Sequence, residues 1–168
     1  MSLAQSLADG LSALPPSAVV LLLAFLPVLE VRASIPIALL VYDMHVVPTF
    51  LISLVGNLLI VPVLFYALPM AELVARKWDA FSRMLDRVYA FTRRKESKRT
   101  ERVEEASLFA IVALPLPGAG TWTAMLTAHV FGLGPRKAWP MIALGSVVEC
   151  VLITAVVVTG AAAWQWLV

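Results

Sequence analysis

Apolar and polar positions divide this 168-residue chain into two long apolar regions with a charged region between them. The first apolar region runs from Val19 to Phe65, the charged region from Pro69 to Glu105, and the second apolar region begins at Ala106. A helix that crosses a membrane needs about 20 mostly apolar residues. Both apolar regions are too long for one such helix, and both are interrupted, so each is predicted to contain more than one element.

The start of the first apolar region predicts a helical hairpin. Ser17–Leu29 and Ile35–Tyr42 are each shorter than a span, and residues that interrupt helices or carry charge lie around their junction: Glu30, Arg32 and Pro36. Irregular backbone at membrane depth is tolerated only where protein or a watery cavity satisfies it. We predict two limbs of a re-entrant hairpin, which enters and leaves the membrane on one side, with these three residues in its bend. Val46–Leu68 then predicts a full span.

The second apolar region repeats this arrangement. Ala106–Val130 is long enough for a span, but it contains a cluster of prolines and glycines: Pro115, Pro117, Gly118 and Gly120. Prolines remove helix hydrogen bonds, and glycines weaken a helix. We predict a second re-entrant hairpin with limbs Ser107–Ala113 and Thr121–Val130. Ala138–Thr159 is the second full span, and it is followed by Trp164 and Trp166 at an interfacial position.

Residues 69–105 predict an amphipathic helix rich in charge. Ten basic and seven acidic residues lie in this segment. Apolar residues recur at a spacing that fits one helix face: Val74, Trp78, Phe81, Leu85 and Val88. This face can lie on the lipid surface, pack on the rest of the protein, or pair with a second copy. Residues 1–16 predict a short interfacial segment, because they carry no Lys or Arg and so lack the positive region of a signal peptide.

Spacing and charge together predict an inverted repeat. Pro27 and Gly56 are separated by nearly the same distance in sequence as Pro115 and Gly145. The basic segment should be cytoplasmic, because Lys and Arg are enriched in cytoplasmic loops. A re-entrant second hairpin returns Arg136–Lys137 to that side. The first hairpin would open to the other side, so the two halves have opposite orientations.

Composition places the chain among integral membrane proteins, because 61% of its residues are hydrophobic. A net charge of +2 gives no support for nucleic-acid binding. The single cysteine, Cys150, excludes an intramolecular disulfide and reads as a small apolar residue. There is no enzyme signature, so we expect no catalytic residues, no cofactor and no metal site, and we expect solvated roles for Asp43, His45 and His129.

Glu30 and Arg32 are the strongest candidates for function. Ionisable side chains inside membrane segments are costly and usually functional. Glu30 could be a protonatable carrier site, and Arg32 could hold a phosphate or carboxylate group. The alternative is a structural ion pair that caps a broken helix.

The proline and glycine cluster of the second apolar region, which we call the second break, has no charged residue. Its candidate ligands are backbone amides and hydroxyl groups. A half-helix that starts at Thr121 could hold an anion, and it could equally be a close-packed turn against the first hairpin. Glu149 could relay protons or pair with Arg32. Packing roles compete with binding roles for Asn57 and Trp122. The candidate substrate or ion-binding residues are Glu30, Arg32, Ser34, Pro36, Asn57, Pro117, Gly118, Gly120, Thr121, Trp122, Thr123 and Glu149.

The runs Glu30–Pro36, Gly56-Asn57 and Leu114–Trp122 resemble the small multidrug export protein family, and this family is similar to the wider DedA/VTT group. The resemblance covers about residues 20–160. It implies facing re-entrant helices in an inverted repeat, and it implies that Glu30, Arg32 and residues 117–123 are functional. Relatives in the DedA/VTT group are associated with moving lipids, including polyprenyl-phosphate carriers, and with proton-dependent drug tolerance. In place of the second acidic and arginine motif of DedA proteins, this chain has Gly118-Ala119-Gly120.

We therefore predict an all-α integral membrane protein with one membrane domain, in which the first repeat is 17–68, the linker helix is 69–105 and the second repeat is 106–168. The expected function is proton-coupled transport of an amphiphile, a polyprenyl-phosphate-type lipid or small drug, at one site between the two breaks. The expected setting is a bacterial or archaeal inner membrane, with membrane lipid as a partner. A homodimer is expected because so few spans do not easily enclose a path. The alternative is a scaffold that organises lipid or recruits partners without transport.

Overall fold

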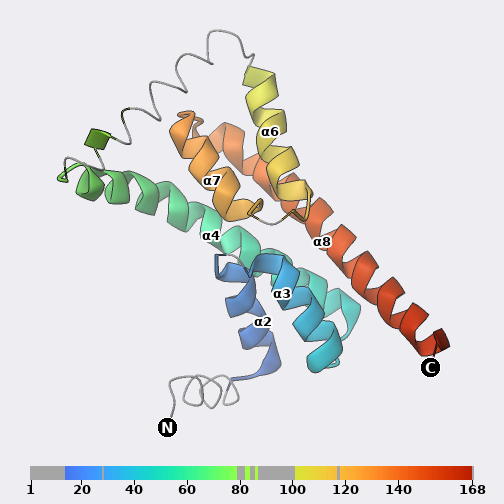
Figure 1. Cartoon of the computed structure of the whole chain (residues 1–168). Coiled ribbons are helices and arrows are strands. Elements are labelled where there is room, and N and C mark those ends of the chain that lie inside the picture. The colour runs from blue at the N-terminus through green and yellow to red at the C-terminus, as the bar shows by residue number, and fades with distance from the viewer. Residues whose placement is uncertain are drawn as a thin grey trace. The chain divides into compact units, whose positions relative to one another are not determined.

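The computed structural model describes residues 14–27, 29–78, 82–83, 86, 101–116 and 118–167, and only the backbone of 101–105 and 161–167. Every regular element in these residues is helical. The helices are α2 (Pro16–Phe25), α3 (Glu30–Pro36), the π-helix η1 (Ile37–Val41), α4 (Val46–Ala75), α6 (Glu101–Ala113), α7 (Thr121–Val130) and α8 (Pro135–Leu167) (Figure 1). The described part of the chain therefore has the predicted all-α class.

Two of these helices are long and apolar enough to cross a membrane, Val46–Ala75 and Pro135–Gly160. They contain the two predicted spans. The predicted end of the first span at Leu68 is too early, because α4 continues through Pro69 to Ala75. The change to charged sequence at Pro69 does not end the helix. Hydrogen bonding continues beyond it, and the Arg76 amide still donates to the Glu72 carbonyl at 2.9 Å.

The chain divides into two compact units. Unit 1 consists of residues 1–57 and 150–168, and unit 2 consists of residues 58–149. The first part of α4 and the last part of α8 thus belong to unit 1, and the remaining parts of both helices belong to unit 2. Each unit contains one pair of short contacting helices, α2 with α3 and α6 with α7.

In unit 1, α2 ends at Phe25 and α3 begins at Glu30, so the break between them comes earlier than predicted. Leu26 is extended (φ −73°, ψ 139°), as expected for a residue that precedes a proline. The prediction that Arg32 and Pro36 lie in the bend is wrong, because both lie within α3, whereas Glu30 is the first residue of α3 and directly follows the break. Pro36 is the last residue of α3, and the next turn is the π-helix η1, where the Tyr42 amide donates to the Ile37 carbonyl at 3.1 Å.

Close backbone approach joins α2 to α4 within unit 1. A Cβ atom on Gly56 would lie 2.7 Å from the Leu21 carbonyl oxygen and 2.8 Å from Ala24 Cβ, so only glycine fits there without movement. The apolar core of unit 1 contains the fully buried Val31, Ile35 and Cys150.

Unit 2 uses a glycine in the same way. A Cβ atom on Gly145 of α8 would lie 2.7 Å from Val112 Cβ and 2.9 Å from the Phe109 carbonyl oxygen, so α6 packs directly on α8. The connection from α6 to α7 contains Gly118 (φ 79°) and Gly120 (φ 137°), backbone conformations that favour glycine. The predicted limb Thr121–Val130 coincides with α7, and the predicted limb that begins at Ser107 begins earlier, at Glu101.

Several predictions fall on residues outside the described part. These are the interfacial segment up to residue 13, most of the linker helix between residues 79 and 100, the side chains of Trp164 and Trp166, and Pro117.

Candidate functional site

Glu30 combines burial with an unusual backbone conformation. It is the first residue of α3, its side chain is 3% exposed, and its φ is +43°. The left-handed region costs a residue other than glycine roughly 1–2 kcal/mol. Such strain persists where the surrounding structure enforces it, and it is concentrated at functional sites. The sequence-based choice of Glu30 therefore falls on a carboxylate held inside unit 1 at a helix break.

Helix α3 separates Glu30 from Arg32 and aligns Glu30 with Ser34. Residues two apart on a helix do not face each other, whereas residues four apart lie on the same face. Arg32 is half-buried, and Ser34 is fully buried. The Ser34 hydroxyl donates a hydrogen bond of 2.9 Å to the Ser53 hydroxyl on α4. The face of α3 that carries Glu30 and Ser34 therefore packs against α4.

A stripe of polar side chains follows α4 at intervals of four residues. Thr49, Ser53 and Asn57 are all fully buried, although they lie in an apolar spanning helix. The Thr49 hydroxyl oxygen has no hydrogen-bond partner among the described residues. Buried polar groups usually find a partner, so an unpartnered hydroxyl needs an explanation. Sequence reasoning selected Asn57 and missed Thr49 and Ser53, although their spacing could have indicated them.

In unit 2, the turn before α7 is held by its own side chains. The Thr123 hydroxyl donates to the Gly118 carbonyl oxygen at 2.7 Å, so Thr123 closes the turn. Thr121 is fully buried, and its hydroxyl lies 3.3 Å from the Ser146 hydroxyl on α8. Trp122 is half-buried.

Helix α8 also has a buried polar face. Ser146 and Glu149 are three residues apart, which places them on the same side of the helix, and both are fully buried. Glu149 was selected from the sequence, and Ser146 was missed. The partner of Ser146 is Thr121, which lies 25 residues away in the sequence, so only the fold reveals this pair. The prediction that both breaks face one common site stays a prediction.

A cluster of charged residues joins α4 to α7 in unit 2. His129 Nε2 lies 2.8 Å from a Glu72 carboxylate oxygen, and Arg76 pairs with Glu72 at 2.8 Å and with Asp86 at 3.2 Å. Hydrogen bonds with Glu72 and Asp86 raise the pKa of the Arg76 guanidinium above its ordinary value. His129 is half-buried, and its contact with Glu72 was not part of the solvated role expected from the sequence.

No group of three or more His, Cys, Asp or Glu side chains that could hold a metal ion occurs among the described residues. The buried polar groups of unit 1 are hydroxyls, the Asn57 amide and the Glu30 carboxylate, and those of unit 2 are hydroxyls and the Glu149 carboxylate. They are suited to hydrogen bonding and proton exchange with a polar group that enters an otherwise apolar protein.

Comparison with known proteins gives one family. Residues 30–152, well over half of the chain, match the model of the family described as "Putative small multi-drug export protein". Neither curated proteins nor solved structures gave a match. The matched range begins at Glu30, so it includes α3 and the α6–α7 pair but not α2, and it ends beyond Glu149. The chain belongs to this small multi-drug export protein family and is a membrane protein.

Proposed function

We propose that this protein moves an amphiphilic substrate across the membrane, a polyprenyl-phosphate-type lipid or a small drug, and that proton binding at Glu30 is coupled to the movement. The observation that carries this proposal is a carboxylate that is 3% exposed at a strained helix break. Ionised groups are costly inside a membrane protein. Taking up or losing a proton at Glu30 therefore changes the free energy of its surroundings and can favour one conformation over another.

The polar stripe of α4 supports a substrate or ion path in unit 1. Ser34 and Ser53 bond to each other, and the buried hydroxyl oxygen of Thr49 has no partner among the described residues. In this proposal Thr49 and Asn57 offer hydrogen bonds to a polar group that passes along α4. The guanidinium of Arg32 has the planar fork that suits phosphate or carboxylate. We assign to Arg32 the binding of an anionic group of the substrate.

We further propose that the two short-helix pairs are re-entrant hairpins in an inverted repeat. Two parallel sets of contacts support this. In each unit the first short helix packs at a glycine of a long helix, Gly56 in unit 1 and Gly145 in unit 2. In each unit the second short helix is joined to a long helix by a pair of hydroxyls. The proposal includes a homodimer in a bacterial or archaeal inner membrane, with residues 69–105 in the cytoplasm.

The transport proposal is tested with purified full-length protein in liposomes that contain either a fluorescent polyprenyl phosphate or a cationic dye. We expect Glu30→Gln to abolish the dependence of transport on a pH gradient and Arg32→Ala to impair transport of the anionic substrate selectively. Asp43→Asn is the matched control, because Asp43 is also a left-handed carboxylate residue (φ 48°) but is exposed. Full retention of proton-driven movement in Glu30→Gln would exclude the carrier role and favour a scaffold that does not transport.

The topology is tested by labelling a cysteine at residue 137 from either side of the membrane. The native Cys150 is fully buried, so it should contribute little background. In Lys137→Cys, we expect a membrane-impermeant reagent to react only from the cytoplasmic side. Reaction only from the outer side would show that the α6–α7 pair crosses the membrane completely, and the inverted repeat would be excluded.

A further inference from the structure

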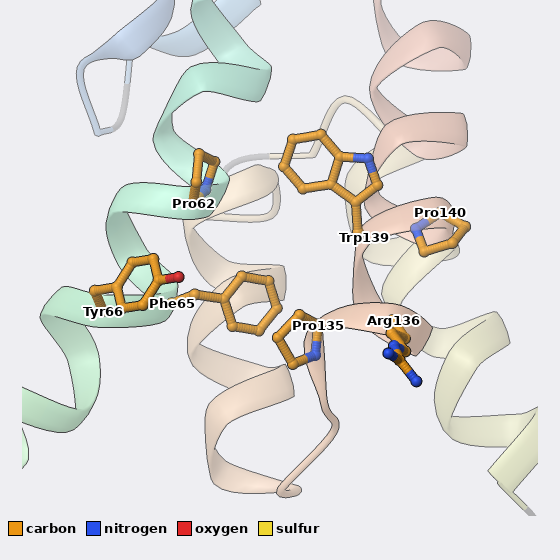
Figure 2. Close-up of a pocket in the computed structure, with 7 residues that line it drawn as sticks. All are labelled: Pro62, Phe65, Tyr66, Pro135, Arg136, Trp139 and Pro140. Atoms are coloured by element: carbon orange, nitrogen blue, oxygen red, sulfur yellow. The ribbon is translucent and has the colours of Figure 1, made fainter.

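A pocket of about 550 Å³ lies between α4 and α8 within unit 2. Three aromatic side chains and one cation give it its chemistry: Phe65, Tyr66, Trp139 and Arg136. Prolines of both helices complete its walls. Figure 2 shows the Phe65 and Trp139 rings pointing into the space between the two helices, with Arg136 beyond Pro135 at the edge. The volume falls within the range of about 300–1,000 Å³ that is typical of small-molecule sites.

The pocket lies where a lipid headgroup would meet the protein. Arg136 is in the first turn of the apolar span Pro135–Gly160, so it marks the end of that span. Tyr66 and Trp139 are exposed, and aromatic residues with a polar atom are enriched at the level of lipid headgroups. The pocket thus has an apolar, aromatic interior and a cationic edge. The interior could hold the acyl chain of a lipid, and the edge could hold its headgroup.

Charge selects the occupant. Among the described residues, Arg136 is the only charged one that lines the pocket, and none of them forms an ion pair with it. An organic cation would be repelled at this edge, and in a zwitterionic lipid the headgroup ammonium would offset part of the attraction between the phosphate and Arg136. A phosphate diester with a net negative charge would gain a charge-assisted hydrogen bond from the guanidinium. The free backbone amides in the first turn of α8 also favour a negatively charged headgroup.

We propose that this pocket is a binding site for an anionic phospholipid of the surrounding membrane, with the phosphate at Arg136 and an acyl chain along Phe65 and Trp139. The pocket shares no residue with the proposed transport site, because its lining residues belong to unit 2 and Glu30 belongs to unit 1. A Glu30→Gln variant should therefore bind the lipid as the unmodified protein does.

The test uses full-length protein in phosphatidylcholine vesicles that contain increasing fractions of dibrominated phosphatidylglycerol, which quenches nearby tryptophan fluorescence. The chain has five tryptophans, so the Trp139 signal is taken as the difference between the unmodified protein and Trp139→Phe. We expect Arg136→Gln to raise the fraction of phosphatidylglycerol needed for half-maximal quenching of Trp139 about fivefold, the effect of one basic side chain on an anionic lipid.

Lys137→Gln is the matched control, because it removes the same charge from the next residue, which does not line the pocket. We expect it to change the half-maximal fraction by less than about twofold, since only general surface charge is lost. Equal effects of the two variants would overturn the proposal, as would equal quenching by dibrominated phosphatidylcholine. Competition by inorganic phosphate would identify a free anion as the occupant and would also overturn it.

Discussion

Replacing Gly56 with alanine tests the close contact between α2 and α4 in unit 1. The added methyl group would lie 2.7 Å from the Leu21 carbonyl oxygen and 2.8 Å from Ala24 Cβ, closer than Cβ atoms pack. Neither atom can rotate away, so α2 must move. Overpacking of this kind typically costs about 1–3 kcal/mol, and alanine recovers up to about 1 kcal/mol of helix propensity relative to glycine. We take the upper cost of about 3 kcal/mol, because the contact involves backbone, and subtract the gain of about 1 kcal/mol. Gly56→Ala should therefore destabilise the protein by about 2 kcal/mol.

The measurement is reversible unfolding in detergent micelles with increasing denaturing detergent, and Gly160→Ala is the control. No atom of the described residues lies within 4 Å of a Cβ atom at Gly160 of α8, so alanine there should be neutral or should stabilise by up to about 1 kcal/mol. Gly145→Ala in unit 2 should resemble Gly56→Ala. If Gly56→Ala unfolds at the same detergent fraction as Gly160→Ala, the close approach of α2 and α4 is refuted.

The other predictions concern single contacts and are measured by the same unfolding assay. In a double-mutant cycle, Ser34→Ala and Ser53→Ala should show a coupling of about 0.6 kcal/mol, as is usual for hydrogen bonds between helices in membranes, and additive effects would contradict the hydrogen bond. Glu72→Gln and His129→Ala should couple by about 1 kcal/mol, and zero coupling would show that the pair does not hold α7 to α4. Glu30→Gly should be more stable than Glu30→Ala by roughly 1 kcal/mol, because glycine adopts the positive φ without strain, and equal stability would contradict the strained backbone.

The sequence predicted those elements whose ends are marked by local chemistry. The start of α4 at Val46 follows the polar turn at Asp43, and α7 begins directly after Gly120, whose positive φ requires glycine. The bend of the first pair was misplaced because three interrupting residues, Glu30 to Pro36, outweighed Pro27 in the pattern. In the structure Leu26, which precedes Pro27, leaves the helical conformation, and Glu30 follows with a positive φ, so the bend lies between these two residues.

The candidate site was predictable only in part, for a related reason. Glu30 and Glu149 stand out because a carboxylate in apolar sequence is costly wherever it lies. Ser53 and Ser146 do not stand out, because a serine is common in membrane helices and its importance depends on the helix that packs against it. Their partners lie 19 and 25 residues away, so the pairing depends on how the short helices turn back on the long ones.

The division of both long helices between the two units has a consequence for the order of folding. Unit 2 is one continuous stretch of chain, residues 58–149, whereas unit 1 contains residues from both ends. During synthesis, all of unit 2 has been made before the last part of unit 1 exists, and at about 5–20 residues per second residues 150–168 follow roughly one to four seconds later. The N-terminal half must therefore wait, with Val31 and Ile35 lacking the Cys150 side of their core, until α8 is complete. A chain that ends at Glu149 should retain a folded second unit and leave the helices around Glu30 without their final support.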